Sequence, residues 1–184
     1  ISPTRVLEVG CGTAEWASTF LRSHPTANYV AVEFAPKMRD VASKRLESYG
    51  ARIQLLDQDL NASLPGGPFD LVVSFYAIHH AENKQRLFEE VFASLVSGGL
   101  FIYADITVAA DPALERTFQD GWVAFMRRAG LDPGRIPHVL ADHRDNDLAE
   151  PSLTQLSYLR AAGFAPAEII WCLEKFALFY GAKP

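Results

Sequence analysis

The stretch RVLEVGCGTA, residues 5–14, decides the fold class of this chain. Its first half, Arg5–Val9, has the apolar character of a short buried strand, and Gly10 and Gly12 follow at once. Glycines at a strand-to-helix turn adopt backbone angles that other residues avoid, and they let a ligand approach the main chain closely. The stretch therefore predicts the first strand–helix unit of an open sheet, with a ligand site at the turn.

Strand-like and helix-like segments then alternate along the chain. We predict parallel strands at residues 5–9, 29–33, 53–56, 70–75 and 100–104. Helices are predicted at 14–21, at 83–96, ended by Gly98-Gly99, and from Pro36 onward. The inward positions of the Pro36 helix would be Met38, Val41, Ala42, Leu46 and Tyr49. Residues 167–173 and 176–180 are joined too tightly for a crossover helix, so these strands should be antiparallel. This alternation predicts a three-layer α/β fold.

One segment interrupts the alternation. Residues 1–184 read as a single domain in which residues 106–150 form a helix-plus-loop insertion over the acceptor site. A helix should begin at Asp111-Pro112, whereas residues 131–150 are polar, lack a clear period and predict a long loop or lid. Ser152 with Gln155 resembles a capping box at the start of the next helix.

Composition narrows the function classes. The chain has 184 residues and a formal net charge of −5, which argues against nucleic acid as the main partner. Two cysteines are too few for a disulfide framework, so we expect a reduced, cytoplasmic setting. No apolar run approaches the length of a membrane span. Because the chain starts at Ile1, close to the first strand, we expect an upstream cofactor-covering segment to be absent.

An acidic residue strengthens the prediction of a ligand site. Glu33 ends the second predicted strand, about twenty residues after the glycine turn, where a carboxylate can accept hydrogen bonds from both ribose hydroxyls. The alternative is a solvated carboxylate at a strand end. Turn and acid together indicate a cofactor that carries a nucleoside.

These residues resemble the class I S-adenosylmethionine-dependent methyltransferases, a Rossmann-like superfamily. VLEVGCGTA is similar to the first motif of that family, with Ala14 where a third glycine is common. PFDLVVSFYAIHH and LVSGGLFIYAD are similar to two later motifs, and the closing pair of strands resembles the family's terminal hairpin. The resemblance implies the strand order 3-2-1-4-5-7-6 and S-adenosyl-L-methionine as the cofactor. The tail also resembles the carboxy-S-adenosylmethionine synthase subgroup of wobble-uridine modification.

The resemblance also implies a set of cofactor-binding residues. Glu8 lies near the cofactor's amino group, and Glu33 binds its ribose. Asp59 reads the adenine amine, with the backbone of Leu60 beside the ring. Met38 lies near the adenine, although a core methionine is an equal alternative. The full predicted set is Glu8, Gly10, Cys11, Gly12, Glu33, Met38, Asp59, Leu60 and Ser74.

Residues just after the fourth and fifth strands should face the methyl acceptor, because ligands bind beyond the carboxyl ends of parallel strands. His79 and His80 are the catalytic candidates, since neutral imidazole is available as a base near pH 7. The alternative is that this pair caps the sheet. The candidates for binding the acceptor are Tyr76, Asp105, Trp122 and His143. For Trp122 the alternative is packing against the sheet, which helical spacing favours.

A metal site is conceivable around His138 and His143, which have Asp142, Asp145 and Asp147 nearby. Their spacing matches no specific signature, so we expect a solvated loop and no metal.

Three rival functions stay open at this point. A nicotinamide-dependent oxidoreductase shares the glycine turn and Glu33, but it predicts neither the later motifs nor the terminal hairpin. A non-catalytic relative could bind the cofactor without transferring a methyl group. A tRNA-modifying enzyme is the third rival. The favoured prediction is methyl transfer to a small molecule, with an oxygen or nitrogen nucleophile ahead of carbon or sulfur.

Overall fold

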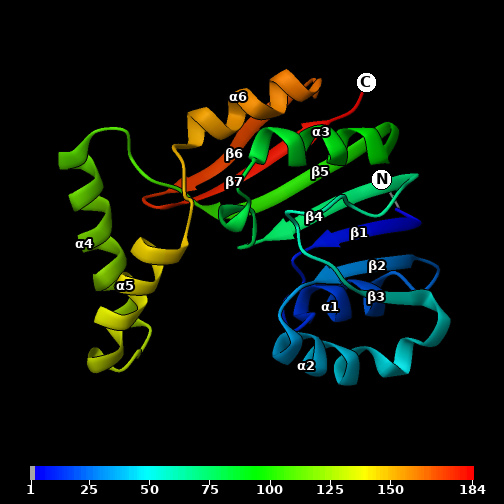
Figure 1. The fold of residues 1–184 in the computed structure, drawn as a ribbon, viewed down its shortest axis with the longest axis horizontal. Coiled ribbons are helices and arrows are strands. Elements are labelled where there is room, and N and C mark those ends of the chain that lie inside the picture. Colours follow the sequence, from blue (N-terminus) through cyan, green and yellow to red (C-terminus); the bar gives the residue numbers. More distant parts are fainter. Residues whose placement is uncertain (1–2) are drawn as a thin grey trace.

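Seven strands form one sheet in the order β3-β2-β1-β4-β5-β7-β6 (Figure 1). The structure, a computed structural model, describes residues 3–184, so the expectation about what precedes Ile1 lies outside the described residues. The strands are β1 (Arg5–Val9), β2 (Asn28–Glu33), β3 (Ile53–Asp57), β4 (Phe69–Phe75), β5 (Leu95–Ile106), β6 (Ala167–Leu173) and β7 (Phe176–Ala182). Strands β1 to β5 pair in parallel, and β7 pairs antiparallel with β5 and β6. The predicted fold class and strand order are confirmed.

Helices cover both faces of this sheet because successive strand residues point to opposite sides. Val6 of β1 packs in a core with α1 (Glu15–Ser23) and α2 (Pro36–Leu46). Leu7, the next residue, packs in a second core with α3 (Lys84–Ser94) and α6 (Ser152–Ala162). Both residues are fully buried. This double burial explains why the inner strands read as continuous apolar runs.

The segment between β5 and α6 is helical throughout most of its length, so the prediction of a long loop over residues 131–150 is wrong. It contains α4 (Pro112–Arg128), a single 3₁₀ turn η3 (Pro133–Arg135) and α5 (Ile136–Asn146). In Figure 1 α4 and α5 stand apart from the two helical layers, beyond the ends of the sheet strands. Their apolar contacts form a small separate core that includes Trp122, Met126 and Ile136. Only Ile136 of α5 is buried, and so sparse an apolar face gives a weak helical period.

Three smaller predictions are corrected. Helix α3 ends at Ser94, and Gly98-Gly99 lies inside β5, where the Gly98 amide donates to the Lys183 carbonyl at 2.8 Å. Of the inward positions predicted for α2, Ala42 and Leu46 are buried, whereas Met38 and Val41 are exposed. Ser152 is the first residue of α6, and no side-chain cap bond is made at that terminus, so the capping box is absent.

Within residues 3–184 no helix is both long enough and apolar enough to cross a lipid bilayer.

Candidate functional site

A cavity of about 630 Å³ opens at the carboxyl ends of the inner parallel strands. Its wall is formed by the residues that follow β1, β2, β3 and β4, where open α/β sheets bind their ligands. The volume is that of a small-molecule site. The lining residues are Glu8, Gly10, Cys11, Gly12, Thr13, Glu15, Trp16, Glu33, Phe34, Ala35, Met38, Gln58, Asp59, Leu60, Asn61, Phe75, Tyr76, Ala77 and His80.

The two glycines of the turn after β1 serve different purposes. Both have positive φ angles, +71° at Gly10 and +55° at Gly12. A Cβ atom at Gly10 would lie 2.2 Å from the Cβ of Ala77, so this glycine lets the β1 turn touch the segment after β4. A Cβ atom at Gly12 would meet no atom within 4 Å. Gly12 therefore leaves open space along the cavity for a ligand to approach the backbone.

Glu33 lies opposite this turn and is bonded to it. One carboxylate oxygen accepts the Gly12 amide at 2.8 Å, and the other accepts the Ala35 amide at 2.8 Å. The two bonds hold the carboxylate at the cavity wall. Two carboxylate oxygens offer about four acceptor sites in all, so acceptor capacity remains for a pair of hydroxyl groups.

Glu8 is a nearly fully buried carboxyl group at the base of the cavity. Burial raises its pKa from 4.5 to about 7, the Tyr29 hydroxyl that donates to it at 2.9 Å opposes that rise, and the charge of Glu33 adds to it. Burial also raises the pKa of the neighbouring Cys11 thiol. Cys11 is therefore a neutral thiol at physiological pH. Glu8 is the group whose ionised form a bound cation would favour.

The residues after β2 and β3 form the opposite end of the cavity. Asp59 accepts the backbone amide of Asn61 at 2.8 Å through one oxygen, which fixes the turn that presents the carboxylate. Leu60 and Met38 line the same cavity. Phe34 follows Glu33 directly and is largely exposed although apolar. This end thus combines an acidic group with apolar surface, as a purine base requires.

Asn61 connects this end of the cavity to the residues that follow β4. Its side-chain amide donates to the His80 carbonyl at 3.3 Å, and its side-chain oxygen accepts the Glu82 amide at 2.9 Å. The turn after β3 and the turn that carries His80 are therefore bridged by one side chain.

Tyr76 and His80 form the cavity wall after β4. Tyr76 is half exposed and has a φ of +57°, a left-handed conformation that is rare for a tyrosine and concentrates at functional sites. His80 ends the single 3₁₀ turn η2 (Ile78–His80) and is also half exposed. These two side chains are the predicted acceptor-site residues that the structure places at the cavity.

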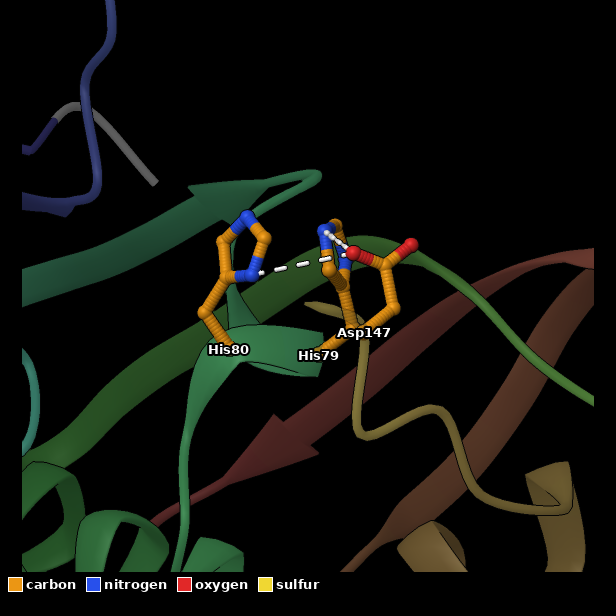
Figure 2. A group of neighbouring side chains, drawn as sticks. All are labelled: His79, His80 and Asp147. Atoms are coloured by element: carbon orange, nitrogen blue, oxygen red, sulfur yellow. Dashed lines mark ion pairs between the residues drawn. The ribbon is translucent and has the colours of Figure 1, made fainter. Parts of the chain in front are cut away.

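His79, the neighbour of His80, is buried and belongs to a connected group of carboxylates and imidazoles. Its Nδ1 lies 2.5 Å from Oδ1 of Asp105, and its Nε2 lies 3.7 Å from Oδ1 of Asp147. His80 Nδ1 is also 3.7 Å from that Asp147 oxygen. The other Asp147 oxygen lies 2.6 Å from His143 Nδ1. Figure 2 shows the imidazoles of His79 and His80 directed toward the carboxylate of Asp147.

Opposing effects act on the pKa of His79. Burial lowers it, but the hydrogen bond to Asp105 and the charges of Asp105 and Asp147 raise it further than burial lowers it, so the net shift is upward. Asp105 is fully buried, and its Oδ2 has no hydrogen-bond partner among the described residues. The histidine pair therefore does not simply cap the sheet by bonding to backbone; His79 faces two carboxylates.

Five of the predicted site residues lie outside the cavity lining, and His79, described above, is one of them. Ser74 is buried, and its hydroxyl donates to the Val9 carbonyl at 2.7 Å, which joins β4 to β1. Asp105 lies behind His79. Trp122 packs in the small α4–α5 core, with its ring 5.3 Å from the ring of His143. His143 contacts Asp147, and His138 is exposed on α5.

Sequence reasoning missed two features of the site. Asp147 was considered only beside a metal site around His138 and His143, yet it is the residue that brings the insertion to His79 and His80. Its position depends on a long-range bond in which the Leu148 amide donates to the His79 carbonyl at 2.8 Å. Phe34 was also missed, although an aromatic residue directly after the ribose-type acid was a usable signal.

The strand order is that of the class I, Rossmann-like methyltransferases, and the cavity lies at the glycine turn. A family model described as "Methyltransferase domain" matches residues 6–99 of the chain. The match spans half of the chain and includes the glycine turn, Glu33, Asp59 and the histidine pair. The chain belongs to this methyltransferase domain family, and the resemblance found in the sequence is confirmed.

Individual relatives are distant. The demethylmenaquinone methyltransferase of Thermus thermophilus is 28% identical over 102 residues, 55% of this chain and 46% of that protein. The carboxy-S-adenosyl-L-methionine synthase of Nitratiruptor sp. is 20% identical over 187 residues, 100% of this chain and 77% of that protein.

Among solved structures, phosphoethanolamine N-methyltransferase 2 of Haemonchus contortus, in complex with S-adenosyl-L-methionine, superposes with a TM-score of 0.72 and 13% identity. The match covers 98% of this chain and 49% of that one. The chain thus spans about half the length of the Thermus and Haemonchus proteins.

Proposed function

We propose that this chain binds S-adenosyl-L-methionine and transfers its methyl group to an oxygen or nitrogen atom of a small molecule. The observation that carries the proposal is the single cavity that joins Gly12, Glu33 and Asp59 at one end to Tyr76 and His80 at the other. A continuous cavity of this kind can hold a nucleoside cofactor at one end and a second ligand at the other. Family membership favours this function over a nicotinamide-dependent oxidation.

The residues present fit the proposed cofactor. Gly12 leaves space that a Cβ would fill, and Glu33 retains acceptor capacity for ribose hydroxyls. Asp59 and Leu60 are available to the adenine, and the carboxyl groups of Glu8 and Glu33 suit a positively charged ligand. When bound, S-adenosyl-L-methionine supplies a methyl group that is activated by its positively charged sulfur.

The acceptor side has to orient a nucleophile and accept its proton. His80 and Tyr76 line the cavity, so they are the side chains that can touch an acceptor. Asp105 orients His79, and Oδ1 of Asp147 lies 3.7 Å from a ring nitrogen of each imidazole. This arrangement supports the histidine pair as the group that activates the acceptor. Positioning of this kind is the main contribution that a protein makes when the leaving group is already activated.

The first test is binding of the cofactor product. S-adenosylhomocysteine at about one hundred times its dissociation constant should stabilise the protein by roughly 2.7 kcal/mol, and NAD should not. Glu33→Ala should weaken this binding at least about tenfold, since hydrogen bonds to a charged group contribute roughly 1.5–3 kcal/mol. Calorimetry gives both affinities.

Asp57→Ala is the matched control for Glu33. Asp57 ends β3 directly opposite Glu33 in the sheet register, but its side chain pairs with Arg39 and does not line the cavity. It should bind S-adenosylhomocysteine like the unchanged protein. Equal affinities for Glu33→Ala and Asp57→Ala would place the cofactor elsewhere.

The second test is transfer itself. Tritium from labelled S-adenosyl-L-methionine should appear in a small-molecule acceptor pool, and His80→Ala should lower that turnover more than it lowers S-adenosylhomocysteine affinity. Binding without any transfer would support the non-catalytic reading.

A second candidate function comes from the relative that aligns with the whole chain, a carboxy-S-adenosyl-L-methionine synthase. If this chain performs that chemistry, mass spectrometry of a reaction that also contains a carboxyl-group donor should detect a carboxylated cofactor and no methylated acceptor.

A further inference from the structure

We propose that His79, His80 and Asp147, here called the His–His–Asp cluster, bind one divalent transition-metal ion beside the cofactor cavity. Within residues 3–184 these side chains are the group whose potential ligand atoms come together, all within 4.8 Å of one another. The binding of the ion stands on this geometry alone. Its role in activating the acceptor rests on the proposed function.

The spacing of the three side chains suits a shared ion better than mutual hydrogen bonds. His79 Nε2 and His80 Nδ1 each lie 3.7 Å from Asp147 Oδ1, which is too long for a hydrogen bond. Two ligand atoms that each bind one ion at about 2.1 Å lie about 3.0–3.4 Å apart. The two histidine-to-aspartate distances exceed this separation by a few tenths of an ångström, and all three ligand atoms lie within 4.8 Å of one another (Figure 2).

Outer partners already orient two of the proposed ligands. Asp105 Oδ1 lies 2.5 Å from Nδ1 of His79, which directs the Nε2 of that ring toward Asp147. His143 Nδ1 lies 2.6 Å from Asp147 Oδ2, which leaves Oδ1 facing the histidine pair. A carboxylate behind a ligating histidine and a donor behind a ligating carboxylate are the usual supports of a metal centre. Asp105 and His143 would be positioning residues, in contact with the ligands but not with the ion.

The backbone also holds the cluster together. His79 and His80 are consecutive in the η2 turn, and the amide of Leu148, next to Asp147, donates to the His79 carbonyl at 2.8 Å. The ligand spacing therefore does not depend on one flexible surface side chain.

The donor set selects the kind of ion. Two imidazole nitrogens with one carboxylate oxygen suit zinc, iron, cobalt or nickel, whereas magnesium prefers oxygen ligands alone. Three protein ligands leave coordination positions open, as in catalytic zinc sites. Because His80 also lines the cavity, an acceptor oxygen could fill one of these positions. An acceptor hydroxyl bound there would release its proton to water more readily, because the ion lowers its pKa.

The test is direct metal binding, measured without turnover. Chelator-treated protein carrying Cys172→Ser, which removes an exposed thiol, is titrated with Zn²⁺ by equilibrium dialysis. Co²⁺ is added in a parallel experiment and followed by its visible absorption. We expect one ion per chain, with affinity reduced at least about tenfold in both His80→Ala and Asp147→Ala.

Two matched controls come from α5, the helix that ends directly before Asp147. Asp142 and His138 are an exposed carboxylate and an exposed imidazole on α5, and neither belongs to the cluster. Asp142→Ala and His138→Ala should bind Zn²⁺ and Co²⁺ like the parent protein. His80 is half exposed, so His80→Ala should fold even if Asp147→Ala does not.

Absence of one-to-one binding, or equal affinity in the parent, His80→Ala and Asp147→Ala, would overturn the proposal. S-adenosylhomocysteine affinity is measured on the same samples. Zinc binding without S-adenosylhomocysteine binding would reject the proposed function and keep the metal site, and the reverse result would reject only the metal site.

Discussion

The two ends of the cavity are built in different ways. We call the end that is proposed to bind the cofactor the cofactor end, and the end that is proposed to face the methyl acceptor the acceptor end. At the cofactor end, the residues come from the ends of β1, β2 and β3, and each is placed by the strand it follows. At the acceptor end, His79 and His80 follow β4, but Asp147 arrives from the end of α5 and is joined to them by the Leu148–His79 backbone bond. The first end is a property of the sheet, whereas the contact of Asp147 with the two histidines at the second end forms only when the insertion folds back onto the sheet.

This difference in construction predicts which end of the cavity tolerates changes in sequence. The cofactor end lies on strands that pack into the two large cores. Glu8 and Glu33 belong to these strands, and Gly10 directly follows one of them. The insertion has its own small core, built around Trp122, Met126 and Ile136. Loops and insertions on a rigid scaffold are where substrate choice resides. Changes in the insertion should therefore alter the acceptor side and spare the cofactor side.

The largest expected effect is at the point where the cofactor end touches the segment after β4. Gly10→Ala places a Cβ 2.2 Å from that of Ala77 at a φ of +71°. Overpacking and a left-handed alanine together should lower the free energy of unfolding by roughly 4 kcal/mol, measured by urea denaturation.

Gly12→Ala is the matched control for that variant. It meets open space at a φ of +55°, so it should cost only about 1–2 kcal/mol. Similar losses in the two variants would mean that the contact of Gly10 with Ala77 is not what limits this turn.

The next effect tests the independence of the insertion. Trp122→Ala removes the largest buried side chain of the α4–α5 core and should cost about 3 kcal/mol of local stability. Hydrogen exchange should accelerate over residues 112–147 and stay slow in β1 and β4, while S-adenosylhomocysteine affinity is unchanged. Loss of affinity in this variant would show that the two ends are one cooperative unit.

The third effect depends on pH and belongs to the cofactor end. The pKa of Glu8 rises from 4.5 to about 7 on folding, so the folded state holds this proton more tightly than the unfolded chain. The contribution to stability is fully present below pH 4.5 and is lost as the pH rises through about 7. Glu8→Gln should avoid that loss, so at pH 8 it should be more stable than the parent by on the order of 3 kcal/mol.

The measurement is thermal unfolding of both proteins from pH 4 to pH 8. Glu15→Gln, an exposed carboxyl at the same cavity, should give a curve parallel to that of the parent. A Glu8→Gln curve that is also parallel would contradict the assigned burial effect.

The sequence allowed most of the fold and the cofactor end to be predicted. Buried parallel strands have continuous apolar sequences. Gly10, Gly12, Glu33 and Asp59 each lie at the end of such a sequence or within a few residues after it. Their positions follow from local rules about strand ends. The terminal hairpin was predictable because only two residues separate its strands.

The acceptor end was less predictable because its arrangement depends on tertiary contacts. His79 and His80 were visible as a pair, but nothing local indicates that Asp147 reaches them. Helix α5 was missed because its apolar face is small. Trp122 was a candidate for the acceptor pocket with packing as the alternative that helical spacing favours, and it packs in the core between α4 and α5.

The side chain of Asn61 has a consequence for how the binding of one ligand affects the binding of the other. It belongs to the turn that presents Asp59, yet it bonds the His80 carbonyl and the Glu82 amide. A cofactor that stiffens the Asp59 turn therefore also stiffens the turn that receives the second substrate. By linkage the two ligands should strengthen each other's binding to the same extent, and we expect steady-state kinetics to follow a sequential scheme in which both ligands are bound before transfer.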